Sequence, residues 1–177
     1  SFDIHEYRLT ALLMLVLKYE KSKSKESKEI VDFYLAQTAR INNWDLVDTS
    51  CYKILGHYCY HEGEEATLFQ LSESQNLWEN RIAIVSTLYF IRKKTLSIVP
   101  EIVLKNINHP HDLMHKANGW MLREMGKKDE EKLILFFTFS RGTPFAAIFL
   151  AKNILIWYIT IKGGGIMQLH IRQRIFS

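Results

Sequence analysis

The first 132 residues carry the spacing of apolar and polar positions that is typical of helices. Apolar residues recur at intervals of three and four, and no alternating run is long enough for a β-strand. The chain opens with SFDIHEYRLTALLMLVLKYE, which lacks a methionine and enters an amphipathic helix at once, so we expect that residues before it are missing. The pattern predicts an all-α fold.

Four of these helices recur at a nearly constant spacing. HEYRLTALLMLV begins at residue 5, INNWDLVDTSCYKIL at 41, WENRIAIVSTLYFI at 78 and MHKANGWMLREMG at 114, so successive starts are 36, 37 and 36 residues apart. Shorter helical stretches lie between them, at residues 26–39, 64–73 and 97–107. Two helices per unit at this period are typical of a HEAT-like solenoid, because each helix pair must stack on the next to bury its apolar face. We therefore predict a right-handed α-solenoid of HEAT-like helix pairs over residues 1–132.

The remaining segment, residues 133–177, differs in composition. It holds five basic side chains and no acidic one, whereas residues 1–132 hold 18 basic and 19 acidic residues. Arg141 and Lys152 divide its apolar run into pieces of about ten residues, and a membrane span needs about 20. We expect a buried helical hairpin with its turn at 142–144, a flexible hinge at the glycines 163–165 and a short strand after it. We interpret 133–177 as a divergent tail, and a shifted reading frame would explain its loss of pattern.

Composition narrows the class of protein. With 47% hydrophobic and 24% charged residues, the chain is neither a disordered segment nor a disulfide miniprotein, and we expect a soluble monomer. Its two cysteines, Cys51 and Cys59, give no disulfide framework, so a reducing cytoplasm is the expected location. His57 and His61 share a helix face from which Cys59 points away, and neither H-E-x-x-H nor C-x-x-C is present, so no metal site is expected.

The recurring helices place equivalent positions of each repeat on the concave side of the predicted solenoid. Arginines and tryptophans occupy the N-terminal parts of these helices, at Arg8, Trp44, Arg81 and Trp120. Asp48 follows Trp44 by four residues and Arg123 follows Trp120 by three, so each pair shares a helix face. We interpret this row as a binding wall and not as core packing.

Three stretches of the sequence resemble motifs of the DNA alkylation repair enzymes, which are HEAT-like-repeat DNA glycosylases. The stretches are NNWDLVD at 42–48, WENRIAIV at 78–85 and HKANGWMLREMGKKD at 115–129, in the family's order and at its spacing. The resemblance covers residues 3–132 and is lost after Lys132. It implies hydrolytic release of purines alkylated at N3 or N7 from double-stranded DNA, without a metal or organic cofactor. It also implies that the lesion stays stacked in the duplex.

The resemblance assigns a catalytic group whose members are Asp48, Arg81, Trp44 and Trp120. A purine methylated at N3 or N7 is already cationic, so the difficult step is the positive charge that develops on the deoxyribose. A carboxylate about 4 Å from that charge is worth on the order of 4 kcal/mol at an effective dielectric of 20. Asp48 would supply this carboxylate and orient the attacking water. The two indoles would flank the sugar and base with their π faces, and Arg81 would hold a phosphate or orient Asp48.

Three basic residues are expected to bind the DNA. The resemblance implies this role for Arg123, while the concave row adds Arg8 and the third motif adds Lys116. The run KSKSKESK at 21–28 is expected to be a solvated loop. The alternative function, from another class, is a non-catalytic HEAT-like scaffold that binds DNA or a protein partner through the same groove.

Overall fold

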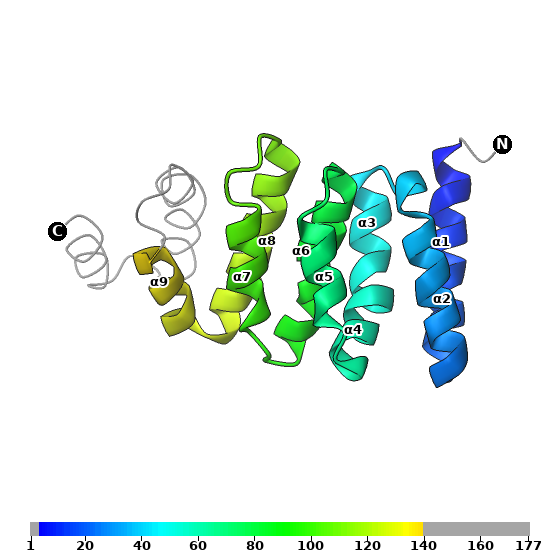
Figure 1. Ribbon diagram of the computed structural model, residues 1–177, viewed down its shortest axis with the longest axis horizontal. Helices are drawn as coiled ribbons and strands as arrows, with labels where there is room; N and C mark the ends of the chain where they lie inside the picture. The colour runs from blue at the N-terminus through cyan, green and yellow to red at the C-terminus, as the bar shows by residue number, and fades with distance from the viewer. Residues whose placement is uncertain (1–3, 140–177) are drawn as a thin grey trace.

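The computed structural model describes residues 4–139, which form a single stack of helices (Figure 1). In chain order the helices are α1 (His5–Lys21), α2 (Ser24–Ala36), α3 (Trp44–Cys51), α4 (His57–Glu62), α5 (Glu65–Ser72), α6 (Leu77–Arg92), α7 (Ile98–Lys105), α8 (Asp112–Lys128) and α9 (Glu130–Phe139). A 3₁₀ turn, η1 (Thr38–Arg40), precedes α3, and a π-helix, η2 (Tyr52–Gly56), joins α3 to α4. The described range contains no β-strand. The prediction of an all-α fold is confirmed.

The helices stack in two rows. One row consists of α1, α3, α6 and α8, and α2, α5 and α7 form the second row beside it (Figure 1). Within the first row α3 packs on α1 and α6, and α6 packs on α8. The structure is thus solenoid-like, with each unit burying its apolar face on the next. The four recurring helices correspond to α1, α3, α6 and α8, which were expected to begin at residues 5, 41, 78 and 114. The shorter helices correspond to α2, α5 and α7, which were expected at residues 26–39, 64–73 and 97–107.

Asparagine side chains fix where α3 and α6 begin. The side chain of Asn43 accepts a hydrogen bond from the backbone N–H of Trp44, and that of Asn76 accepts one from Trp78. Such caps satisfy N–H groups that the helix itself leaves without partners. They place Asp48 and Arg81 one turn inside their helices, where α3 and α6 pack together.

A glycine allows the helix that follows α3 to approach α6 closely. Gly56 ends η2, and a Cβ atom at this position would overlap the backbone carbonyl oxygen of Ser86 in α6. The helical backbone runs without a break from α3 through η2 to α4, and both cysteines lie on it as buried free thiols. Single turns of π-helix inside α-helices occur frequently at functional sites.

Two other expectations concern the charged run and the tail. The solvated loop expected at 21–28 is wrong, because α1 continues to Lys21 and α2 begins at Ser24, which leaves a turn of two residues. The first arm of the expected hairpin falls in α9, whereas its turn at 142–144, its second arm, the hinge and the strand lie outside the described residues. Position 132, where the expected boundary falls, is inside α9, which packs on α8 and in which Leu133, Phe136 and Phe137 are buried. No helix among residues 4–139 has the length and apolarity needed to cross a bilayer.

Candidate functional site

A carboxylate and a guanidinium form a bidentate pair where α3 meets α6. Arg81 donates from Nε to Oδ1 of Asp48 over 3.0 Å and from Nη2 to Oδ2 over 2.8 Å. Two parallel bonds of this kind fix the plane of the carboxylate. Arg81 is 5% exposed and the Asp48 side chain is 16% exposed. The pair is therefore largely shielded from water, but part of the Asp48 carboxylate remains accessible to solvent.

A third hydrogen bond ties this pair to α8. Nη1 of Arg81 donates to the backbone carbonyl oxygen of Leu113, in the first turn of α8, over 2.6 Å. Arg81 therefore links three helices of one row and orients Asp48, which is one of the two roles expected for it. The expectation of an exposed wall is wrong at this position, because the protein itself uses these N–H donors. No sequence signal marks the Leu113 carbonyl, since every residue carries one.

The environment of Asp48 acts on its ionisation in two opposite ways. Burial is the largest influence and raises the pKa of the Asp48 carboxyl above its ordinary value, because desolvation disfavours the charged form. The hydrogen bonds and charge of Arg81 lower this pKa but do not cancel the effect, and the neighbouring Asp45 raises it further. The result is a poorly hydrated carboxylate that interacts strongly with a positive charge placed beside it.

The two tryptophans expected near Asp48 differ in exposure. Trp44 is the first residue of α3, lies one turn before Asp48 on the same helix face, and is 54% exposed. Trp120 is half-buried and packs against the core from α8, two turns after Leu113 on the same face of that helix. Trp44 thus offers an open indole face, whereas packing holds Trp120.

Arg8 is engaged within the protein. Its Nη1 donates to the backbone carbonyl oxygen of Arg40 over 3.2 Å and to Oδ1 of Asn42 over 2.5 Å, so it ties α1 to the segment that leads into α3. A second link between these helices joins His5 Nε2 and Asp45 Oδ2 over 2.7 Å. Asp45, which was not a candidate from the sequence, therefore connects α1 to α3. The carboxylate that pairs with Arg81 is that of Asp48, three residues later.

The other two candidate DNA-binding residues lie on α8 and are more exposed. Lys116 forms an ion pair of 2.7 Å with Asp112 one turn earlier on the helix, and its side chain is 68% exposed. Arg123 has an exposed side chain whose Nε lies 3.8 Å from Oε1 of Glu124. Exposed pairs of this kind contribute little stability, so both cations are available to a ligand of opposite charge.

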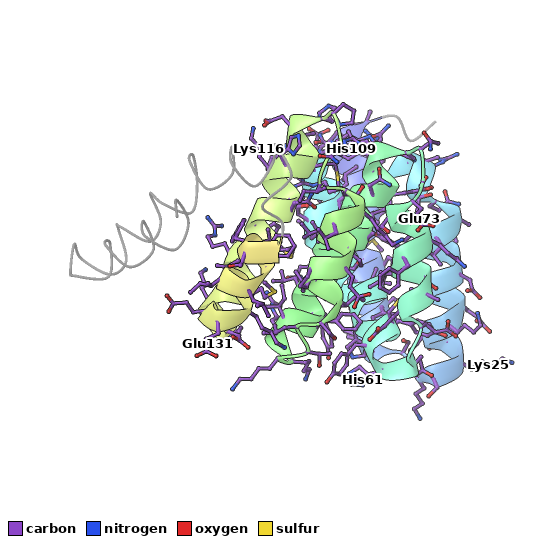
Figure 2. The ribbon with its side chains drawn as sticks, turned by 60° about the vertical axis from the view of Figure 1, so that its left-hand side comes forward. Lys25, His61, Glu73, His109, Lys116 and Glu131 are labelled. Atoms are coloured by element: carbon purple, nitrogen blue, oxygen red, sulfur yellow. The ribbon has the colours of Figure 1, made fainter. Side chains whose placement is uncertain are left out.

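The histidine pair of α4 belongs to a different part of the molecule. Figure 2 shows His61 at the edge of the stack opposite to Lys116. His57 Nδ1 lies 2.9 Å from the hydroxyl of Tyr19, and His61 Nε2 lies 3.0 Å from that of Tyr89. Cys59, which lies between the two histidines in the sequence, is fully buried. Within the described range, no three or more His, Cys, Asp or Glu side chains are grouped so that they could hold a metal ion.

Comparison with known proteins finds one matching family model and a similar solved structure. Residues 1–143 match the family model of the DNA alkylation repair enzymes. A solved structure described as a predicted DNA alkylation repair enzyme from Enterococcus faecalis has a TM-score of 0.64 and 21% identity, and the match covers 85% of this chain and 69% of that one. At this identity the structural likeness shows the fold. No curated protein matches the chain.

Proposed function

This chain belongs to the DNA alkylation repair enzyme family, and we propose that it is a DNA glycosylase. Its substrates would be purines alkylated at N3 or N7 in duplex DNA, and it would hydrolyse their N-glycosidic bond. The observation that carries the proposal is the desolvated Asp48 carboxylate, which Arg81 orients on the same helix face as the open indole of Trp44. We propose further that the enzyme acts as a monomer in the cytoplasm.

The chemistry of such a substrate requires an anion. An alkylated purine carries a positive charge before it leaves, so the base needs no proton, and charge accumulates on the deoxyribose as the bond breaks. A carboxylate can accept about four hydrogen bonds, and Arg81 uses one site on each oxygen of Asp48. The remaining lone pairs are free to stabilise the sugar cation and to position the attacking water.

Trp44 supports this chemistry from the same helix. Its exposed indole lies one turn from Asp48, and the face of an indole attracts a cation within about 6 Å. An alkylated purine is such a cation, whereas an undamaged purine is neutral. The indole therefore favours damaged bases by roughly 0.5 to 2 kcal/mol where water is excluded.

Replacement of Asp48 by asparagine tests the proposal. Asp48→Asn keeps the shape and one acceptor for Arg81 but removes the negative charge, so we expect release of 7-methylguanine from alkylated duplex DNA to fall by about a thousandfold, equivalent to about 4 kcal/mol. The measurement is a single-turnover rate of base release, made together with the affinity for undamaged duplex.

Asp45→Asn is the matched control, because it makes the same chemical change three residues away on α3, where Asp45 contacts His5. We expect its release rate to stay within about threefold of the parent protein. Equal release by the Asp48 and Asp45 variants would remove Asp48 from the reaction. Retained DNA binding with no release by the parent protein would favour the scaffold.

A further inference from the structure

A second contact, between η2 and α6, follows the Asp48–Arg81 pair along the helical backbone. Tyr52 lies four residues after Asp48, and the helical backbone continues through both, so the two side chains share a face. Arg92 lies eleven residues after Arg81, which is about three turns of α6, so these two also share a face. The guanidinium carbon of Arg92 lies 4.6 Å from the centroid of the Tyr52 ring.

The cations at this contact have no carboxylate partner among the described residues. None of the ion pairs in residues 4–139 involves Arg92 or Lys53. Lys53 Nζ also lies 5.8 Å from the Tyr52 ring centroid. Arg92 is exposed, so its charge faces solvent without compensation. This is the opposite of Arg81, whose donors the protein uses itself.

Stacking on Tyr52 prepares Arg92 for a ligand. A guanidinium held against an aromatic face keeps a fixed plane, while its N–H groups stay directed outward at the edge of that plane. Less conformational entropy is then given up when those N–H groups bind a planar or tetrahedral oxyanion. Phosphate is an oxyanion that arginine recognises well in this bidentate way.

We propose that Arg92, positioned by Tyr52, binds a backbone phosphate of the duplex that carries the damaged nucleotide. This inference rests on the proposed function, and it names an interaction that the sequence motifs do not include. Arg92 follows Arg81 by eleven residues of α6, a rise of about 16 Å, whereas one strand of a duplex advances about 3.4 Å per nucleotide. The phosphate therefore belongs to a nucleotide several positions from the lesion.

The salt dependence of DNA binding tests this interaction. In Arg92→Gln we expect roughly three- to tenfold weaker binding to an undamaged duplex and a slope of log affinity against log salt that is shallower by about 0.9, the value for one phosphate that is no longer neutralised. Lys28→Gln is the control, because it removes one positive charge from an exposed pair with Asp32 on α2 and should leave the slope unchanged. A role of Arg92 in stability alone would change the unfolding midpoint and not the slope. An unchanged slope in Arg92→Gln overturns the inference.

The role of Tyr52 is tested by a pair of variants. Tyr52→Leu removes the ring and should weaken binding in the same direction as Arg92→Gln, whereas Tyr52→Phe keeps the ring and should restore the affinity of the parent protein. Full affinity in Tyr52→Leu would overturn the positioning role. If the parent protein released no alkylated purine but bound DNA with an Arg92-dependent slope, the proposed function would fail and this inference would stand. If it bound no duplex at all, both would fail.

Discussion

Burial and pairing with Arg81 shift the pKa of Asp48 in opposite directions. Burial raises its pKa, and the hydrogen bonds and charge of Arg81 lower it. A group whose pKa is raised in the folded protein gives up its proton at a higher pH than a free aspartate does. If the ionised form is the one that stabilises the sugar cation, the activity depends on this balance.

The pH dependence of base release follows from that balance. We expect the release rate to fall as the pH is lowered, with a midpoint above the ordinary pKa of an aspartate, because protonation of Asp48 removes the anion. In Arg81→Lys the midpoint should move to higher pH, since one ammonium cannot make both parallel bonds and the charged carboxylate is less stabilised.

The measurement is a single-turnover release rate between about pH 4 and 8, after subtraction of the spontaneous loss of the alkylated base. A folded fraction that is constant with pH changes the amplitude of the profile and not its midpoint, so circular dichroism at each pH separates acid unfolding of the Arg81 variant from titration of Asp48. Identical midpoints in the two proteins would show that ionisation of Asp48 does not control the rate.

Among the helices, the approach of η2 to α6 depends on one glycine. We expect Gly56→Ala to destabilise the protein by about 1 to 3 kcal/mol, because the new Cβ overlaps a backbone oxygen that cannot rotate away. Gly126→Ala in α8 is the comparison, since the atoms nearest to its Cβ would all belong to the Leu133 side chain, which can shift. Urea unfolding of both variants is the measurement. A Gly56 variant as stable as the Gly126 variant would contradict the close packing of η2 on α6.

The helices were more predictable than the segments that join them. Apolar spacing identified both rows, because burial of one helix face imposes that spacing. The charged run at 21–28 was assigned wrongly, because charged residues suit an exposed helix as well as a loop. Lys21 lies in the last turn of α1, where a cation is favourable, and Lys28 pairs with Asp32 one turn later in α2.

At the scale of the whole molecule, the sequence predicted the parts of the candidate site that depend on side-chain identity. Asp48 and Arg81 stood in recognisable motifs, and the structure brings them into contact. The Leu113 carbonyl left no signal, because a backbone group is the same in every residue. The contact of Tyr52 with Arg92 also left none, since it depends on how η2 and α6 pack and not on a local pattern.

A stack in which each helix pair touches only its neighbours should open from its ends. Eleven of the sixteen residues of α6 are buried, but only three of the seventeen residues of α1, which leaves Tyr7, Met14 and Leu17 exposed. We therefore expect amide hydrogens of α6 to exchange most slowly and those of α1 much faster, as native-state hydrogen exchange would measure. Equal protection of both helices would mean that the stack opens as one unit. Since Asp48, Arg81 and Leu113 come from α3, α6 and α8, base release should persist under conditions in which α1 already exchanges freely.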